Sequence, residues 1–276
     1  MILPSYHDSI KSKEGDEWIN RVLMRPLAWK IVELLFHTTI TPNQITVVST
    51  LTGIIGAVLL LYNTHPAFIA AGIFFFLKDL FDTTDGQLAR AKKIVSRRGR
   101  FYDSIGDFVV SLCVFAALTF VVWKNTNRNS IVFLGVIAFV TSLLRVSYNV
   151  FYQTMLLHRQ HRYLENRIQE NILAQDISGD IVALRLQKIF LILYGWQDRL
   201  MVQIDLWCRT NSTIVLPQFY ENKRAIFFTS FIGLATETFC IVCFSLCNAP
   251  ELYLYCNIFV LNGYWLFVIL YRKNLK

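Results

Sequence analysis

Residues 104–152 read SIGDFVVSLCVFAALTFVVWKNTNRNSIVFLGVIAFVTSLLRVSYNVFY, and this stretch decides the fold class. It holds two apolar runs, Ser104–Trp123 and Ile131–Tyr152, separated by a short polar segment. A helix of about 20 residues is long enough to cross the roughly 30 Å hydrocarbon core of a bilayer. The stretch therefore predicts two antiparallel transmembrane helices joined by a turn.

The rest of the chain continues this pattern. Of its 276 residues, 54% are apolar and only 17% are charged, whereas a soluble domain usually carries about 25% charged residues. Four further apolar runs are long enough to be spans: Ile45–Tyr62, Pro66–Phe81, Ala225–Cys247 and Leu252–Tyr271. We therefore expect an all-α, polytopic membrane protein with six transmembrane helices, and we exclude an ordinary soluble globular domain.

The positions of the basic residues predict the orientation of these spans. All but four of the 27 Lys and Arg residues lie in the N-terminal segment, in two alternate connections or in the C-terminal tail. By the positive-inside rule, both termini and these connections are cytoplasmic. Topology and attraction to anionic lipid headgroups then explain the net charge of +8, and we expect no nucleic-acid partner.

Two parts of the chain lie outside the predicted spans. Residues 1–43 form a cytoplasmic or interfacial segment, in which Asp16–Phe36 has the spacing of an amphipathic helix lying along the membrane surface. Residues 44–276 form the transmembrane domain, and its long cytoplasmic connection near 153–224 is too polar to span. We expect one or two helices in this connection, with a break at 178–180.

Four carboxylates flank the turn between the second and third spans. Asp82 and Asp85 are spaced i, i+3, and Asp103 and Asp107 are spaced i, i+4, so each pair projects from one helix face. The connection 91–102 is short enough to bring both pairs together. Like charges this close repel one another, and a divalent cation relieves the repulsion. Oxygen ligands without a nearby His or Cys favour Mg²⁺ or Mn²⁺ over Zn²⁺.

The residues between the carboxylates favour phosphate chemistry. Gly86 and Ala89 are small and leave room for a ligand or a second helix near the acidic face. Arg90 can offer a bidentate guanidinium to a phosphate. The simpler alternative is that the acids cap helices or pair with neighbouring basic residues, but four acids interleaved with small residues and an arginine favour a binding site.

Residues 82–107 resemble the signature of the CDP-alcohol phosphotransferase (CDP-alcohol phosphatidyltransferase) family. The signature is Asp-x2-Asp-Gly-x2-Ala-Arg-x8-Gly-x3-Asp-x3-Asp, and all eight of its fixed positions are met. Residues 42–46, Pro-Asn-Gln-Ile-Thr, are similar to a second family element, Pro-Asn-x-x-Thr. A motif with this many fixed positions is specific, although it covers only a small part of the chain.

The resemblance implies transfer of a substituted phosphate from a CDP-linked donor to an alcohol hydroxyl, with release of CMP. It implies that Asp82, Asp85 and Asp103 are metal ligands. It also implies that Asp107 is the general base, which can share the second of two Mg²⁺ or Mn²⁺ ions. Five further residues match positions that contact the CDP donor: Asn43, Thr46, Gly86, Arg90 and Ser96. The family also forms homodimers, so we expect that two copies can associate.

The sequence indicates the substrates less specifically than it indicates the reaction. The chain length favours CDP-diacylglycerol as donor with a small polar alcohol as acceptor, in phospholipid biosynthesis; CDP-choline, CDP-ethanolamine or a CDP-polyol is the alternative. The basic residues at 92–100 suit either an anionic acceptor or anionic lipid. Two rival classes are an acidic-site transporter and a lipid-pyrophosphate phosphatase.

The sequence leaves two alternatives for the role of each of two charged residues within the predicted spans. Glu237 is either functional or hydrogen-bonded to a neighbouring span. Arg145 points either towards the carboxylates or, by snorkelling, towards the interface.

Overall fold

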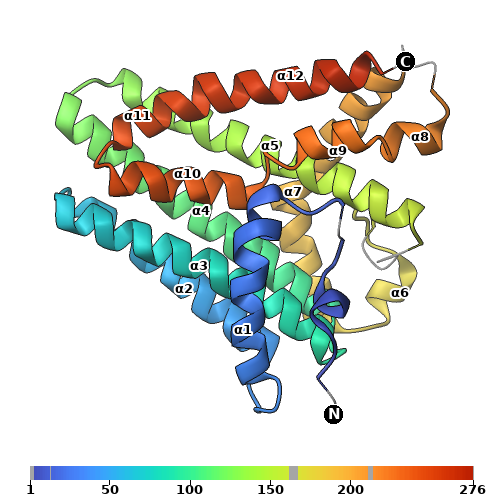
Figure 1. Ribbon diagram of the computed structural model, residues 1–276. Coiled ribbons are helices and arrows are strands. Elements are labelled where there is room, and N and C mark those ends of the chain that lie inside the picture. The colour runs from blue at the N-terminus through green and yellow to red at the C-terminus, as the bar shows by residue number, and fades with distance from the viewer. Residues whose placement is uncertain (1–2, 13, 162–166, 211–213, 276) are drawn as a thin grey trace.

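The computed structural model of the protein describes residues 3–12, 14–161, 167–210 and 214–275. Every regular element in this part of the chain is helical (Figure 1). The elements are η1 (Tyr6–Ser9), η2 (Asn20–Met24), α1 (Arg25–Leu35), α2 (Pro42–Leu61), α3 (His65–Ala91), α4 (Arg97–Thr126), α5 (Ser130–Arg159), α6 (Ala174–Ile177), α7 (Ile181–Arg209), α8 (Leu216–Tyr220), α9 (Lys223–Thr229), α10 (Leu234–Leu246), α11 (Pro250–Tyr255), η3 (Cys256–Leu261) and α12 (Asn262–Lys273). The expected all-α class is confirmed.

Five helical segments of the described chain are long and apolar enough to cross a membrane. They are Pro42–Leu61, Arg97–Thr126, Ser130–Arg159, Leu216–Leu246 and Pro250–Lys273. The other expected span, Pro66–Phe81, lies within the 27-residue helix α3, whose apolar run is interrupted by charged residues from Lys78 onward. Length and composition thus give a multi-pass membrane protein with five candidate spans among the described residues, and the sixth stays a prediction.

Helix α2 packs closely against α3 and α4 because glycines face its neighbours. A Cβ added at Gly53 would lie 2.6 Å from Cγ1 of Val110 on α4, and one added at Gly56 would lie 2.7 Å from Cε1 of Phe75 on α3. Small residues at such contacts let helix backbones approach without relying on the hydrophobic effect, which is weak between helices in lipid. This packing fixes the position of the α3–α4 turn, where the acidic residues lie.

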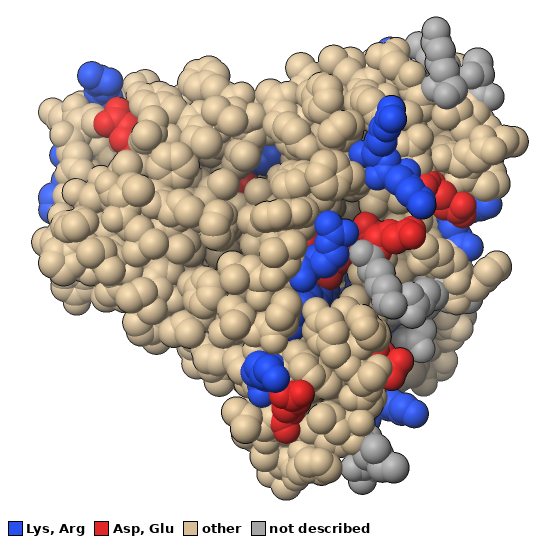
Figure 2. All heavy atoms as spheres, viewed as in Figure 1, with Lys and Arg blue, Asp and Glu red and all other residues tan. Residues whose placement is uncertain are grey.

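Charged side chains are distributed unevenly over the molecule. In the view of Figure 1 both chain ends lie towards the right, whereas the turn between α2 and α3 lies at the left. Figure 2 shows a broad area, between a few charged side chains at the left edge and a larger group towards the right, in which charged atoms are visible only in a central hollow. A band with so little charge is typical of the surface that faces lipid.

The expected span Ala225–Cys247 is not one continuous helix. Helix α9 ends at Thr229 and α10 begins at Leu234. The carboxyl of Glu17 fills the break and accepts a hydrogen bond from the Thr236 N–H at 3.2 Å. A Cβ at Gly233 would lie 2.1 Å from Cδ of Glu17, so only glycine fits there. The N-terminal segment thus inserts between two helices of the bundle.

The predicted amphipathic stretch near the N-terminus is helical from η2 through α1. Met24 and Val32 are buried against the bundle, whereas Lys30 and Leu34 are exposed. This distribution fits an amphipathic helix, and its place at the membrane surface stays a prediction.

The connection 153–224 contains more helix than a simple loop would. Helix α5 continues to Arg159, and α7 is a 29-residue helix that packs against α4 and α5. The predicted break at 178–180 is confirmed, because Asp180 caps the start of α7 by accepting a hydrogen bond from the Val182 N–H at 2.9 Å.

Candidate active site

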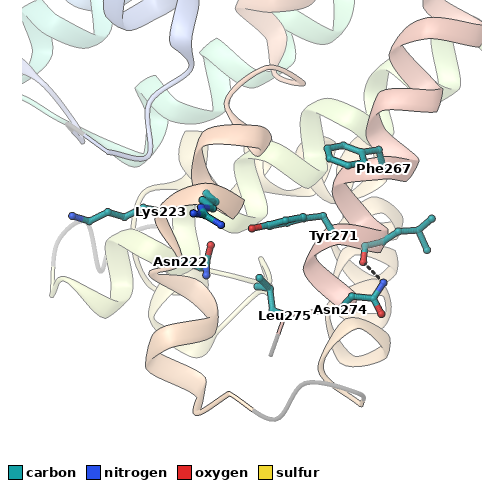
Figure 3. Close-up of a pocket in the computed structure, with 8 residues that line it drawn as sticks. Asn222, Lys223, Phe267, Tyr271, Asn274 and Leu275 are labelled. Carbon is teal, nitrogen blue, oxygen red and sulfur yellow. Dashed lines mark hydrogen bonds between the residues drawn. The ribbon is translucent and has the colours of Figure 1, made fainter.

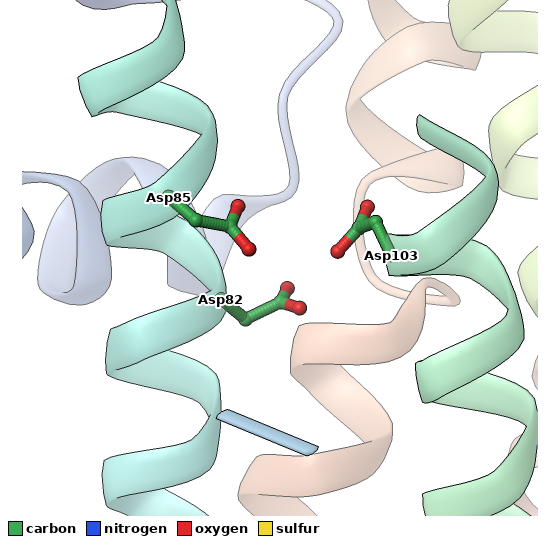
Figure 4. A group of neighbouring side chains, drawn as sticks. All are labelled: Asp82, Asp85 and Asp103. Atoms are coloured by element: carbon green, nitrogen blue, oxygen red, sulfur yellow. The ribbon is translucent and has the colours of Figure 1, made fainter. Parts of the chain in front are cut away.

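Three of the four signature aspartates converge at the α3–α4 turn. Asp82 and Asp85 project from α3 and Asp103 projects from α4, and their carboxylates point towards one another (Figure 4). One carboxylate oxygen of each residue lies within 4.8 Å of the others. Ser96 caps the start of α4 by accepting a hydrogen bond from the Gly99 N–H at 3.1 Å, which places Asp103 two turns into the helix.

The chemistry of this group fits a divalent cation. Oδ1 of Asp103 is buried and has no hydrogen-bond partner among the described residues. A buried carboxylate oxygen without a partner is costly, and a bound cation would supply the missing contact. The group consists of oxygen ligands only, which suits Mg²⁺ or Mn²⁺. These three residues can therefore hold a metal ion, with Asp82 partly open to solvent.

Asp107 lies one turn beyond Asp103 but has a different partner. Its Oδ1 accepts a hydrogen bond from Nζ of Lys78 at 2.5 Å. The same ammonium lies 3.6 Å from Oδ1 of Asp82. The four acids therefore share one region of the molecule, with three grouped as potential metal ligands and the fourth paired with a lysine.

Thr46 and Asn43 bring the start of α2 to the site. Oγ1 of Thr46 donates a hydrogen bond to Oδ2 of Asp85 at 2.5 Å. A Cβ at Gly99 would lie 3.2 Å from Oδ1 of Asn43, so this signature glycine lets α4 approach the beginning of α2. Thr46 thus lies beside Asp85 and Asn43 lies beside the start of α4, and the contact of these two residues with a nucleotide stays a prediction.

Arg90 and Gly86 lie on α3, after the aspartates. Nε of Arg90 donates a hydrogen bond to the backbone oxygen of Ser9, so the N-terminal segment contacts the predicted phosphate-binding arginine. A Cβ at Gly86 would lie 3.3 Å from Nη1 of Arg90, which shows that the guanidinium folds back over the glycine.

The basic residues that open α4 are paired within the protein. Arg97 forms ion pairs with Glu170 and Asp176, and Arg100 also pairs with Glu170. Arg98 pairs with Asp180. These arginines therefore dock the α5–α7 connection onto α4, and they are not positioned as free contacts for an anionic acceptor or lipid.

Acidic Asp176 is firmly held in this network. Hydrogen bonds from Arg167 keep the pKa of its carboxyl well below the ordinary value of 3.8, and Gln187 and Arg97 act in the same direction. Asp176 is therefore ionised over the ordinary pH range, as its ion pairs with Arg97 and Arg167 require.

Arg145 and Glu237 form a buried ion pair inside the bundle. Nη2 of Arg145 lies 2.6 Å from Oε2 of Glu237, and the two side chains are 1% and 5% exposed. Glu237 also accepts hydrogen bonds from Tyr253 Oη and Asn257 Nδ2, and Arg145 donates to Asn262. Glu237 is therefore hydrogen-bonded to its neighbours, as one alternative proposed. Arg145 neither reaches the aspartates nor snorkels to the interface, because Glu237 holds it inside.

Two surface hollows differ in their relation to the aspartates. A pocket of 740 Å³ between α9 and the end of α12 is lined by residues such as Asn222, Tyr271 and Asn274, and none of the predicted site residues lines it (Figure 3). A groove of 840 Å³ is lined by Asn43, Phe81 and other mainly apolar side chains of α1–α4. Of these two hollows, the groove is the one that adjoins the candidate site, through Asn43.

Comparison with known proteins assigns the family. The model of the CDP-alcohol phosphatidyltransferase family matches residues 39–215, which is more than half of the chain. The chain belongs to this family. The matched range extends from the loop before α2 to the segment after α7, so this CDP-alcohol phosphatidyltransferase domain includes all nine predicted site residues.

Three curated relatives share the name "Bifunctional IPC transferase and DIPP synthase". The protein of Thermococcus kodakarensis is 36% identical over 135 residues, covering 49% of this chain and 29% of that protein. The protein of Archaeoglobus fulgidus is 29% identical over 112 residues, covering 41% and 22%. The protein of Aquifex aeolicus is 33% identical over 104 residues, covering 38% and 23%. The matches thus span less than a third of the length of these relatives.

Lys78 is the site residue that sequence reasoning missed. Lys78 lies inside the apolar run Pro66–Phe81, which was expected to be a span, and no role was predicted for it. Its i, i+4 spacing from Asp82 was the available signal, because a lysine at the end of a span and one turn before an acid is positioned to pair with it. Its partner Asp107 lies on another helix, and α3–α4 packing alone brings them together.

Proposed function

We propose that this family member transfers a substituted phosphate from a CDP-linked donor to an alcohol hydroxyl and releases CMP. The single observation that carries the proposal is the convergence of Asp82, Asp85 and Asp103 across the α3–α4 turn. A divalent cation held there, Mg²⁺ or Mn²⁺, would neutralise charge on the donor pyrophosphate and on the departing CMP.

The side chains of this site have complementary roles in the proposed reaction. Asp107 takes the proton of the acceptor hydroxyl, whose oxygen attacks the phosphorus of the transferred group, while the bond to CMP breaks. Thr46 orients Asp85 through its hydrogen bond. Arg90 turns from the Ser9 carbonyl to the phosphates of the CDP donor. Gly86, Ser96 and Asn43 make further contacts with the CDP donor.

CDP-diacylglycerol is the donor that we propose, with a small polar alcohol as acceptor and a role in phospholipid biosynthesis. The apolar groove of 840 Å³ that includes Asn43 and Phe81 adjoins the site and suits acyl chains. CDP-choline, CDP-ethanolamine or a CDP-polyol is the alternative donor.

We also propose that both termini and the active site face the cytoplasm. The proposal is supported by the positions of the Lys and Arg residues and by the two chain ends, which lie towards the same side in Figure 1. The homodimer that the family resemblance implies stays a prediction.

The rival transporter function fits the acids less well. Transporter sites typically lie near the bilayer midplane between repeated halves. Here the acidic cluster lies at the turn between two helices, and the acid deeper in the bundle, Glu237, is neutralised by Arg145.

A transfer assay in liposomes tests the proposal. Purified protein is incubated with labelled CDP-diacylglycerol, CDP-choline or a CDP-polyol, Mg²⁺, and a panel of alcohols including glycerol phosphate, inositol phosphate and serine. We expect CMP release and a labelled product that both depend on the alcohol. Asp85→Asn should abolish both, whereas the control Lys30→Met, at an exposed position on α1, should keep both. CMP release without any alcohol would indicate a hydrolase, and no turnover of any CDP donor would refute the proposal.

A further inference from the structure

Lys78 is built into the carboxylate site. It is 4% exposed, and its ammonium lies between Asp107 on α4 and Asp82 on its own helix, 2.5 Å and 3.6 Å from their oxygens. The α2 helix makes room for its stem, because a Cβ at Gly53 would lie 3.1 Å from Cγ of Lys78. Oγ of Ser49 donates a hydrogen bond to the backbone oxygen of Lys78 at 2.8 Å. These contacts hold the lysine in place from three helices.

The ammonium occupies the space that a second metal ion would need. An ion bound to both Asp82 and Asp107 would have to lie about 2.0–2.6 Å from an oxygen of each. The Lys78 nitrogen already lies at 2.5 Å from the Asp107 oxygen, so ion and ammonium cannot occupy this position together. Repulsion between the two cations in a partly buried site acts in the same direction.

The space behind this pair is also too small for a hydrated ion. Lys78 and Asp107 line an enclosed cavity of 20 Å³, whose other walls include Phe75, Val110 and Ile241. A cavity of this size holds about one water molecule. Mg²⁺ gives up its water reluctantly and usually keeps several water ligands. At the three-aspartate group, Asp82 and Asp103 are both partly exposed, so an ion bound there can keep water ligands.

We propose that Lys78 takes the place of a second divalent cation. The nucleotide-free site then binds one ion, on Asp82, Asp85 and Asp103, and Lys78 holds Asp107 outside the metal ligands as an oriented carboxylate. Lys78 is a positioning residue, since it acts through Asp107. The inference rests on the proposed function, because it assumes that the three aspartates bind metal, and it differs from the two ions that the family resemblance implies.

Counting bound manganese tests this role directly. Metal-free protein in detergent is titrated with Mn²⁺, and bound ions are counted by elemental analysis and by electron paramagnetic resonance. The variants are Lys78→Met, the double variant Lys78→Met with Asp107→Asn, and Lys30→Met as the control, since Lys30 is exposed and pairs only with Glu33 in the described structure. Two Mn²⁺ ions about 3.5–4 Å apart are spin-coupled and give a spectrum distinct from that of a single ion.

We expect one uncoupled Mn²⁺ in the wild type and in Lys30→Met. Lys78→Met frees the oxygens of Asp82 and Asp107, so it should bind a second ion and show a coupled spectrum. The double variant should return to one ion because it lacks the Asp107 ligand. A coupled pair in the wild type overturns the inference, as does a single ion in folded Lys78→Met.

The wild-type count decides the question even if Lys78→Met does not fold. One uncoupled ion supports the proposal and two overturn it. Failure of the proposed function gives a different result, because a protein whose three aspartates are not a metal site binds no stoichiometric Mn²⁺ in the wild type, the control or either variant.

Discussion

Oγ1 of Thr46 on α2 donates a hydrogen bond of 2.5 Å to Oδ2 of Asp85 on α3. Thr46 is 6% exposed, so this bond is shielded from water and fixes the direction of the carboxylate. The family resemblance assigned Thr46 to the nucleotide site, and the structure adds a contact to a predicted metal ligand. Hydrogen bonds of this kind orient metal-binding side chains and contribute to metal affinity.

Thr46→Val should weaken metal binding about 10- to 100-fold, because Asp85 loses the donor that orients it. Thr46→Ser keeps the hydroxyl and should stay close to the wild type. Titration with Mn²⁺, followed by electron paramagnetic resonance, measures both dissociation constants. Equal affinities in the valine and serine variants would show that the hydrogen bond does not support the metal site.

Asp107→Asn should lower the rate of transfer by about 10²- to 10⁴-fold, because the amide cannot accept the proton of the alcohol. The three converging aspartates stay intact, so Mn²⁺ binding and metal-dependent CMP binding should persist. Turnover with a labelled CDP donor and CMP binding by calorimetry measure the two effects separately. A purified variant with wild-type turnover would remove Asp107 from the role of base.

Removal of divalent cations should abolish transfer. The carboxylates of Asp82, Asp85 and Asp103 lie close enough to repel one another without a cation, and the donor adds further negative charge. Dialysis against EDTA followed by addition of Mg²⁺ or Mn²⁺ checks this, with restored activity as the expected result. Activity that survives complete chelation would contradict the metal site.

Local patterns in the sequence were sufficient to predict much of the fold and part of the site. The apolar run at 131–152 lies within α5, and the run at 45–62 lies within α2 except for Tyr62, because length and hydropathy alone decide whether a segment can span a bilayer. The convergence of Asp82, Asp85 and Asp103 was also predictable, since it depends on helical spacing and one short turn.

Contacts between distant segments were not predictable in the same way. Glu17 fills the break at Gly233, and Arg97 on α4 pairs with Glu170 in the α5–α7 connection. Each contact depends on which helices lie side by side, and hydropathy carries no information about neighbours when every helix is apolar. The sequence presents these residues as isolated charges, whereas their partners are set by tertiary packing.

The buried pair of Arg145 and Glu237 should be sensitive to the loss of either partner. Breaking a buried ion pair leaves an unpaired charge and typically costs about 3–5 kcal/mol, while replacing both partners with apolar residues costs much less. Arg145→Met and Glu237→Met should therefore each lower the thermal unfolding midpoint in detergent more than the double variant does. Glu33→Gln, which breaks the exposed pair with Lys30, should change it little. Equal effects of single and double variants would refute the coupling.

The docking of the N-terminal segment should weaken as the pH rises. Burial raises the pKa of Glu17 from its ordinary value of 4.5 to about 8, and the nearby Asp79 acts in the same direction. In the unfolded chain this carboxyl ionises near 4.5, so the contribution of Glu17 to stability is fully present below that pH. It declines as the pH rises and is lost once the pH passes the folded pKa of about 8, where the folded protein has to bury a carboxylate next to Asp79.

Glu17→Gln keeps an oxygen that can accept the Thr236 N–H bond and removes the titration. Protease protection of the N-terminal segment and the unfolding midpoint should therefore fall between about pH 4.5 and 8 in the wild type and stay flatter in Glu17→Gln. Glu14→Gln is the matched control, because Glu14 is exposed on the same segment and should follow the wild-type curve. If Glu17→Gln follows the same curve as the wild type, another group causes the pH dependence and the carboxyl at the α9–α10 break does not control docking.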